Sequence, residues 1–344
     1  MSLKIISGSS NENLARDISS NLGLELSETT RKKFADGEWN LHINKNVRGD
    51  KIFLIQTGSY PVNDHIQELL LLLQTLKLSS VGQITVVIPY FPYSRQDRKT
   101  KPRVPISAAL VAKQIEVMEP NHILTLDLHC GQIQGFFQKT PVDNLYTDTI
   151  FVKYLKENNY HLMNDLVIVS PDAGGVTRAR RIADKLGGLP LITILKRRVE
   201  ANKVDTMEII GNVENKRCLI VDDIVDTAGT LCKAVDVLTE KGCFSVDACI
   251  THGILSDPAL ERIQNNNSIN KMIVTNSIPQ EEHQLKCPKI HVLDIAPLFA
   301  EAIRRIYNNE SLSELFSVTE SPNISEEDKL FHNKELLSAL TQEK

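Results

Sequence analysis

Short runs of consecutive apolar, often β-branched residues constrain the fold of this chain more than any other feature. ITVVI at 84–88 and LVIV at 166–169 lack the polar alternation of a strand with one solvated face. Such runs are typical of parallel strands that helices bury on both faces. Six of the strands expected from such runs are Lys51–Gln56, Ile84–Pro89, His122–Leu128, Leu166–Ser170, Cys218–Val221 and Phe244–Ile250.

The segments between these runs have the spacing of amphipathic helices. In one of them, Leu231, Ala234, Val235 and Leu238 recur at i, i+3, i+4 and i+7, and Gly242 can end that helix. Alternating strands and helices predict an α/β fold with crossover connections between parallel strands.

The length of 344 residues favours two domains over one. A weak internal echo supports two similar domains: KIFLIQTGSYPVND resembles LVIVSPDAGG, and HILTLDLHCGQIQ resembles RCLIVDDIVDTAG. We expect an N-terminal domain at 1–145, a C-terminal domain at 146–316, and a mobile polar tail at 317–344 with a short helix at Lys334–Leu340.

Composition excludes several classes of protein. The formal net charge of −4 gives no overall case for nucleic-acid binding. The six cysteines form no CxxC pair, which indicates a reducing compartment. The densest apolar run, Leu69–Leu73, is too short to span a membrane, and MSLKIISGSS indicates a strand rather than a signal peptide. A cytoplasmic chain without a membrane partner is expected.

The stretch VDDIVDTAGT at 221–230 combines two chemistries directly after an expected strand. Residues 227–230 are small or hydroxylated and lie where a helix begins, and the free N–H groups and dipole of a helix start favour a phosphate. The three carboxylates before them suit sugar hydroxyls or a magnesium ion. Ribose 5-phosphate requires both features, whereas a capped helix with a solvated acidic turn requires no ligand. The candidate binding residues are Asp222, Asp223, Asp226, Thr227, Ala228, Gly229 and Thr230.

The same stretch resembles the phosphoribosyl-diphosphate-binding loop of the type I phosphoribosyltransferase fold. Four further segments extend the resemblance: FPYSRQDRK at 91–99, DLHCGQIQGFF at 127–137, VSPDAGG at 169–175 and THGILS at 251–256. Together they resemble the ribose-phosphate pyrophosphokinase family over nearly all of residues 3–316. The resemblance implies two similar phosphoribosyltransferase-like domains, each a mainly parallel sheet flanked by helices.

The resemblance also implies a reaction and a cofactor. The diphosphoryl group of ATP would pass to the 1-hydroxyl of ribose 5-phosphate, giving 5-phosphoribosyl 1-diphosphate and AMP for nucleotide biosynthesis. By resemblance, His129 binds a Mg²⁺ ion that also contacts ATP, and Asp172 places a second Mg²⁺ with the ribose hydroxyls. From the residues alone, a surface or packed histidine and a simple Pro-Asp-Gly turn remain the alternatives.

The residues implied for ATP come from two segments. Arg95 and Gln96 follow FPYS, and an arginine suits phosphate contacts or stacking on adenine. In FADGEW at 34–39, the resemblance implies that Phe34 stacks on the base and that Asp36 and Glu38 accept from its amino group. The family presents this loop to a neighbouring subunit, which implies a homo-oligomer, commonly a hexamer built from dimers.

LKRRVEANKV at 195–204 is a charged stretch that follows the apolar strand expected at Leu191–Leu195. Lys196 and Arg198 match the family's catalytic K-x-R at the base of a mobile loop. Two cations there would offset charge on the transferred group and on the departing AMP. A solvated basic turn is the alternative.

A regulatory anion site is implied for phosphate-activated, ADP-inhibited members of the family. The matching positions in this chain are Arg48, Gln134, Ser311, Ser313 and Phe316. Gly131 lacks a side-chain hydroxyl that would strengthen such a site, so the sequence leaves regulation open.

Two other functions compete with this hypothesis. A nucleobase phosphoribosyltransferase would need the ribose loop but neither His129 in this setting nor the Arg95–Gln96 pair. A non-catalytic subunit could keep the fold and assemble with active relatives, but such proteins tend to carry damaged motifs. Production of AMP by the purified chain alone distinguishes these alternatives.

Overall fold

The structure is a computed structural model that describes residues 2–197 and 206–317. It confirms the expected α/β class and has two units. Unit 1 joins the residues up to Tyr146 to the segment that begins at Ile295, and unit 2 is Thr147–Asp294. The tail expected after residue 317, with its helix at Lys334–Leu340, lies outside the described residues.

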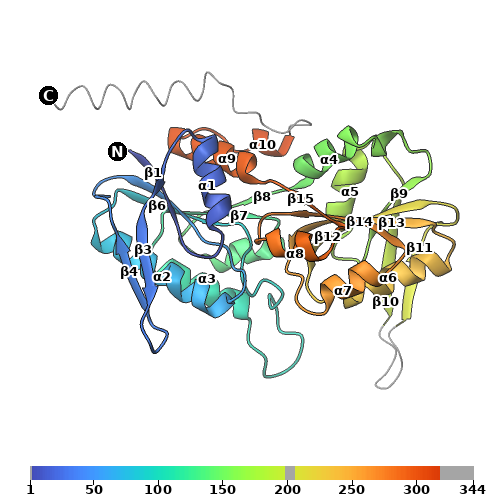
Figure 1. Ribbon diagram of the computed structural model, residues 1–344, viewed down its shortest axis with the longest axis horizontal. Helices are drawn as coiled ribbons and strands as arrows, with labels where there is room; N and C mark the ends of the chain where they lie inside the picture. Colours follow the sequence, from blue (N-terminus) through green and yellow to red (C-terminus); the bar gives the residue numbers. More distant parts are fainter. Residues whose placement is uncertain (1, 198–205, 318–344) are drawn as a thin grey trace. The chain divides into compact units, whose positions relative to one another are not determined.

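Unit 1 is built on a six-stranded parallel sheet of order β2-β1-β5-β6-β7-β8. Its strands are β1 (Leu3–Ser7), β2 (Leu26–Ser27), β5 (Lys51–Ile55), β6 (Gln83–Ile88), β7 (His122–Leu126) and β8 (Val142–Leu145). Figure 1 shows helices on both sides of this sheet. They are α1 (Glu12–Asn21), α2 (Val62–Leu78), α3 (Ser107–Val117) and α9 (Ala296–Asn308), with a 3-10 helix η1 (Gly131–Phe136) and a short α10 (Glu314–Ser317). Strands β3 (Thr29–Lys33) and β4 (Trp39–Ile43) form a separate antiparallel hairpin.

Unit 2 has a seven-stranded sheet of order β11-β10-β9-β12-β13-β14-β15, parallel except for the β10–β11 pair. Its strands are β9 (Leu166–Ser170), β10 (Leu191–Arg197), β11 (Thr206–Ile210), β12 (Arg217–Val225), β13 (Ser245–Gly253), β14 (Ile269–Thr275) and β15 (Ile290–Leu293). Its helices are α4 (Asp148–Glu157), η2 (Tyr160–Leu162), α5 (Val176–Lys185), α6 (Gly229–Glu240), α7 (Ala259–Asn265) and α8 (Glu281–Lys286).

Burial on both faces of the unit 2 sheet explains its apolar runs. Along β9, Leu166 and Ile168 belong to a core cluster with residues of α4 and α5, whereas Val167 and Val169 belong to a cluster with residues of α6 and α7. Successive side chains of a strand point to opposite faces, so both faces need apolar residues. All six expected strands are present, with ends that differ by up to four residues.

The strand orders show which segments of the two units correspond. The unit 1 order β2-β1-β5-β6-β7-β8 matches β10-β9-β12-β13-β14-β15 of unit 2 strand for strand, with β11 added at the edge. Strand β1 therefore corresponds to β9, and β5 corresponds to β12. The internal echo paired β5 with β9 and β7 with β12, and that pairing is wrong. Strands buried on both faces share one apolar composition, so composition does not identify a strand's position.

The C-terminal helix α9 belongs to unit 1, whereas the sequence-based division assigned residues 146–316 to the second domain. Helix α9 packs against α1, and Phe299 and Ile303 are fully buried. Lys51 of β5 also donates a hydrogen bond to the carbonyl oxygen of Tyr307, at 3.1 Å. The chain thus returns to the first unit after completing the second. Among the described residues, no helix combines the length and the apolar character needed to cross a bilayer.

Candidate active site

The candidate ribose segment begins inside a strand. The strand expected at Cys218–Val221 continues as β12 to Val225, paired with β13 as far as Gly253. Asp222 and Asp223 therefore lie on the last residues of a central parallel strand rather than in a turn. Asp223 is buried, and its backbone N–H donates to Oδ1 of Asp222 at 2.9 Å.

A short turn connects β12 to α6. Ala228 is the N-cap of α6 and has φ +55°, in the left-handed region that favours glycine. Thr227 and Thr230 are exposed on either side of it. Helix α6 spans twelve residues, so its first N–H groups and dipole present a donor-rich surface beside the two hydroxyls.

Arg178 of α5 is the nearest described cation to the acidic pair. Its Nη1 lies 3.3 Å from Oδ1 of Asp223 and 3.9 Å from Oδ1 of Asp222. Burial raises the pKa of the Asp222 carboxyl well above its usual value, the charges of Asp223 and Asp172 raise this pKa further, and Arg178 lowers it. Asp222 and the buried Asp223 therefore form an acidic pair beside Arg178.

Asp172 lies in the turn between β9 and α5. Its Oδ1 accepts a hydrogen bond from the Gly175 N–H at 2.9 Å, and its carbonyl oxygen accepts from the Ser170 hydroxyl at 2.7 Å. A Cβ on Gly175 would lie 2.9 Å from that hydroxyl oxygen, so a larger residue there would have to displace the Ser170 side chain. Since β9 and β12 are adjacent parallel strands, Asp172 and the acidic pair lie at the same edge of the sheet.

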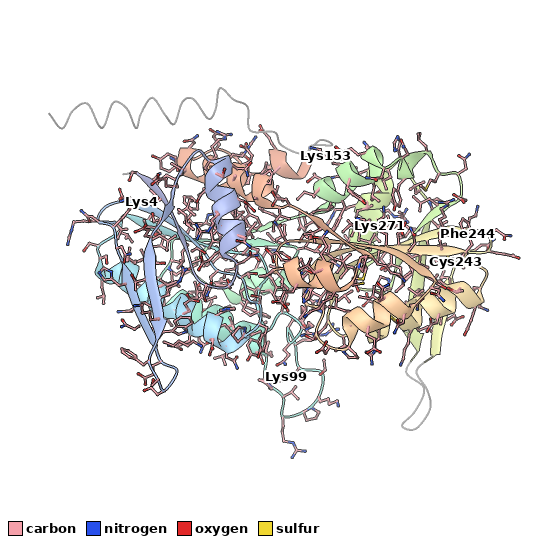
Figure 2. All side chains as sticks on the ribbon, viewed as in Figure 1. Lys4, Lys99, Lys153, Cys243, Phe244 and Lys271 are labelled. Atoms are coloured by element: carbon pink, nitrogen blue, oxygen red, sulfur yellow. The ribbon has the colours of Figure 1, made fainter. Side chains whose placement is uncertain are left out.

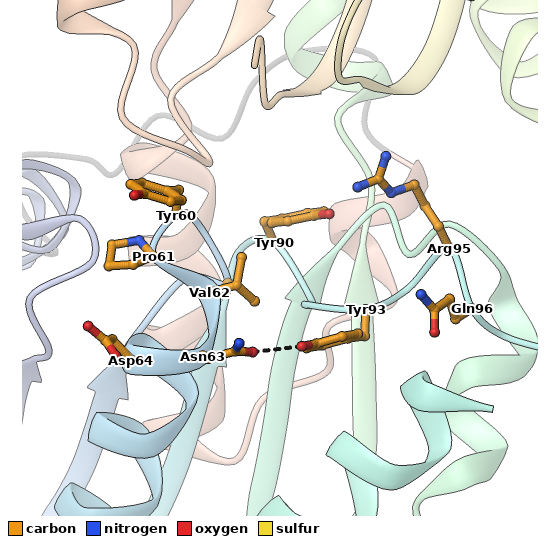
Figure 3. A pocket seen from close by; sticks show the side chains of 10 residues that line it. Tyr60, Pro61, Val62, Asn63, Asp64, Tyr90, Tyr93, Arg95 and Gln96 are labelled. Atoms are coloured by element: carbon orange, nitrogen blue, oxygen red, sulfur yellow. Dashed lines mark hydrogen bonds between the residues drawn. The ribbon is translucent and has the colours of Figure 1, made fainter. Parts of the chain in front are cut away.

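In unit 1, Arg95 and Gln96 line a pocket of about 490 Å³. Figure 3 shows Tyr60, Tyr90 and Tyr93 in the same pocket, with the Tyr93 hydroxyl donating to Oδ1 of Asn63 at 2.6 Å. The pocket joins the turn after β5 to the loop after β6. Its volume is within the range of small-molecule sites, and its aromatic walls and arginine suit a nucleotide. The basic residues that follow Arg95 are Arg98, Lys99 and Lys101. They lie on the loop between β6 and α3, where Figure 2 labels Lys99.

His129 is exposed shortly after β7 ends at Leu126. The preceding N–H of Leu128 donates to Oδ1 of the buried Asn144 at 3.0 Å, and Asp127 has φ +38°. The neighbouring strand β8 thus fixes the backbone from which His129 projects.

The FADGEW segment forms the tip of the β3–β4 hairpin. The Phe34 N–H donates to the carbonyl oxygen of Glu38 at 2.8 Å, and the Phe34 side chain is 55% exposed. Trp39 pairs with Lys33 at the loop end of the hairpin, where the Lys33 ammonium lies 4.8 Å from the centre of the Trp39 ring. The exposed Phe34, Asp36 and Glu38 are presented away from their own core, as a contact with another molecule requires.

The remaining predicted residues have the following places. Lys196 belongs to β10, but its side chain is not described, and Arg198 lies outside the described residues. Arg48, Ser311 and Ser313 are exposed. Gln134 lies in η1, and the Phe316 side chain is not described. Within 2–197 and 206–317, no group of three or more histidine, cysteine, aspartate or glutamate side chains is arranged to hold a metal ion.

Comparison with known proteins agrees with this arrangement. Residues 3–118 match the model of the N-terminal domain of ribose phosphate pyrophosphokinase, and residues 193–317 match the phosphoribosyl synthetase-associated domain. The ribose-phosphate pyrophosphokinases of Campylobacter jejuni and Helicobacter pylori are each 48% identical to this chain, over 91% of it and over 98% and 96% of their own lengths. The crystal structure of phosphoribosylpyrophosphate synthetase from Mycobacterium smegmatis aligns with a TM-score of 0.84 at 37% identity, covering 90% of this chain and all of that one.

The chain belongs to the ribose-phosphate pyrophosphokinase family. It is an ATP-dependent diphosphotransferase that makes phosphoribosyl diphosphate from ribose 5-phosphate. The sequence-based prediction of family and activity is therefore confirmed, in preference to the nucleobase phosphoribosyltransferase and non-catalytic alternatives.

Sequence reasoning missed several residues that contact the candidate site residues. Arg178 and Arg262 contact the ribose segment from α5 and α7, and Asn144 supports the backbone before His129. Each is distant in sequence from the residue it contacts. The THGILS segment, quoted only for its resemblance, was the one available signal for the region before Arg262.

Proposed function

We propose that ribose 5-phosphate binds along the segment from Asp222 to Thr230. The observation that carries this proposal is the direct succession of carboxylates at the end of β12 and donor groups at the start of α6. Asp222, Asp223 and Asp226 accept hydrogen bonds from the 2- and 3-hydroxyls. The N–H groups of Ala228 and Gly229 and the hydroxyls of Thr227 and Thr230 hold the 5-phosphate.

The acidic end of this segment would suit a divalent cation that substrate oxygens and water also ligate, since the described side chains form no three-ligand group by themselves. The raised pKa of Asp222 reflects burial and the like charges of Asp223 and Asp172, which a cation would relieve. Oxygen ligands match the preference of Mg²⁺. We assign Asp172 to one Mg²⁺ and His129 to another, and the metal supplies charge neutralisation for the phosphates.

Unit 1 carries the residues proposed for ATP. Arg95 and Gln96 contact the nucleotide at the pocket of Figure 3. Phe34, Asp36 and Glu38 serve the adenine of a neighbouring subunit, because their hairpin tip is exposed and closed by a hydrogen-bonded turn. The enzyme accordingly acts as a homo-oligomer, a hexamer built from dimers in our proposal, in the cytoplasm.

Lys196 and Arg198 are the proposed catalytic residues. Attack by the sugar 1-hydroxyl on the β-phosphorus displaces AMP, and two cations stabilise the charge that develops on the transferred group and on AMP. A regulatory anion is assigned to the site of Arg48, Gln134, Ser311, Ser313 and Phe316.

Phosphorus NMR of the purified chain with Mg²⁺, ATP and ribose 5-phosphate tests these roles. AMP and a sugar diphosphate signal should appear together and only with the sugar present. Asp223→Asn should slow this conversion at subsaturating sugar and leave the response to ATP concentration unchanged. An unaltered dependence on ribose 5-phosphate would refute the assignment of the ribose segment.

A further inference from the structure

Arg262 of α7 is bound to the ribose segment from outside it. Its Nη1 donates to the carbonyl oxygen of Thr227 at 2.9 Å. A Cβ on Gly229 would lie 3.2 Å from the same nitrogen, so the guanidinium sits directly against the first residue of α6. Helices α6 and α7 pack side by side, which brings Arg262 to this position.

The bonded carbonyl belongs to the peptide that precedes the helix. Ala228 supplies the first helical acceptor, since its carbonyl oxygen accepts from the Cys232 N–H at 2.9 Å. The Thr227–Ala228 peptide lies one residue before this acceptor, so the i to i−4 hydrogen bonds of α6 do not fix its orientation. A trans peptide is planar, so its carbonyl and N–H point in opposite directions. Holding the Thr227 carbonyl on Arg262 therefore aims the Ala228 N–H away from α7.

The segment that leads to Arg262 contacts the ribose segment a second time. The N–H groups of Ile254 and Leu255 both donate to the carbonyl oxygen of Val225, at 2.9 and 3.2 Å. The chain from residue 251 to 262 thus fixes one peptide at the end of β12 and one at the start of α6. These contacts give the THGILS segment a structural role that its sequence alone did not reveal.

We propose that Arg262 is a positioning residue for the 5-phosphate of ribose 5-phosphate. It holds the Thr227–Ala228 peptide in the one orientation that directs the Ala228 N–H into the phosphate cradle. This inference rests on the proposed location of ribose 5-phosphate. It assigns Arg262 no contact with the reacting atoms.

Steady-state kinetics of Arg262→Met, Arg262→Lys and a matched control test the proposal. Arg262→Met removes the hydrogen bond that holds the Thr227 carbonyl, and because this contact is exposed to solvent we expect KM for ribose 5-phosphate to rise severalfold. We expect kcat and KM for ATP to change less than about twofold, because a positioning effect on ground-state binding leaves the chemical step intact. Arg262→Lys, which keeps one donor, should fall between wild type and Arg262→Met.

Lys233→Met is the control for charge alone. Lys233 is an exposed cation one turn further along α6, and its removal lowers the local charge equally without touching the Thr227 peptide. It should leave KM for ribose 5-phosphate unchanged. An equal rise in both variants would overturn the hydrogen-bond argument in favour of long-range charge.

Thr230→Val separates the two proposals. If Thr230→Val raises KM for ribose 5-phosphate and Arg262→Met does not, the positioning role fails while the ribose site stands. If neither variant changes it, the proposed location itself fails. A fall in thermal midpoint for Arg262→Met with an unchanged KM would likewise reduce Arg262 to a structural residue.

Discussion

Glu301 of α9 offers a test of how ion pairs within the C-terminal segment stabilise it. Its carboxylate accepts hydrogen bonds from Arg304 at 2.8 and 2.9 Å and from Arg305 at 2.6 Å, and its side chain is 8% exposed. Burial alone would raise the pKa of this carboxyl, but the hydrogen bonds and charges of the two arginines outweigh it and hold the pKa below its usual value.

Glu301→Gln removes the charge and keeps the shape. Breaking a fully buried ion pair costs about 3–5 kcal/mol, and an exposed pair contributes about 0–1 kcal/mol. The arginines here are 18% and 16% exposed and retain Glu310 and Glu314 as partners. We therefore expect the free energy of unfolding to fall by about 2 kcal/mol at neutral pH, between these limits.

The pH dependence distinguishes this reasoning from a simple loss of packing. Because the folded-state pKa of Glu301 is lowered, its stabilisation is present above the pKa of the unfolded chain and is lost as the pH falls through the folded value. Urea unfolding of wild type and variant at matched pH should give a difference that shrinks as the pH falls below the ordinary pKa of a glutamate carboxyl. Glu310→Gln, which removes a 40% exposed partner of Arg304, should cost less than about 1 kcal/mol. A Glu301→Gln penalty that is independent of pH would refute the argument.

Three further changes test the two proposed substrate sites. Gly58→Ala places a Cβ 2.6 Å from Cδ of Pro92 and 2.7 Å from the Pro92 backbone nitrogen, so it should displace the loop that carries Arg95. Initial-rate assays should then show KM for ATP raised severalfold. Gly135→Ala is the control and should leave KM for ATP unchanged, because a Cβ there has no neighbouring atom within 4 Å. Ala228→Val puts a β-branched residue at φ +55° in a site that is 4% exposed, and urea unfolding should show a loss of about 2 kcal/mol. Lys196→Ala should lower kcat far more than it weakens ribose 5-phosphate binding, measured by calorimetry, and comparable losses in both would contradict a role in the transition state.

The sequence was most informative where one local interaction decides the structure. The apolar run LVIVS predicts β9 with the bounds that the structure has, since a strand buried on both faces needs apolar residues at consecutive positions. The spacing of Leu231, Ala234, Val235 and Leu238 likewise predicts the buried face of α6, and Gly242 follows that helix with φ +87°. These patterns depend on residues a few positions apart.

Features that depend on distant partners were not predictable in this way. The ribose segment was recognisable from its residues, but the extension of β12 to Val225 follows from its pairing with β13. Arg178 and Arg262 are ordinary helical arginines in the sequence, and only the fold brings them to Asp223 and Thr227. The position of α9 in unit 1 depends on its packing against α1, which is distant from it in the sequence.

The correspondence of the two sheets relates the candidate substrate sites to each other. Since β5 corresponds to β12, the turn between β5 and α2 in unit 1 is the topological counterpart of the ribose turn between β12 and α6. That unit 1 turn supplies Gly58, Tyr60 and Pro61 to the pocket that also holds Arg95. In both units, therefore, the same crossover provides a candidate substrate site, at the carboxyl ends of the strands, where parallel sheets place ligands. The turns differ in chemistry: an acidic strand end precedes the turn in unit 2, whereas aromatic side chains surround it in unit 1. One topology thus suits a sugar phosphate in one unit and a nucleotide in the other.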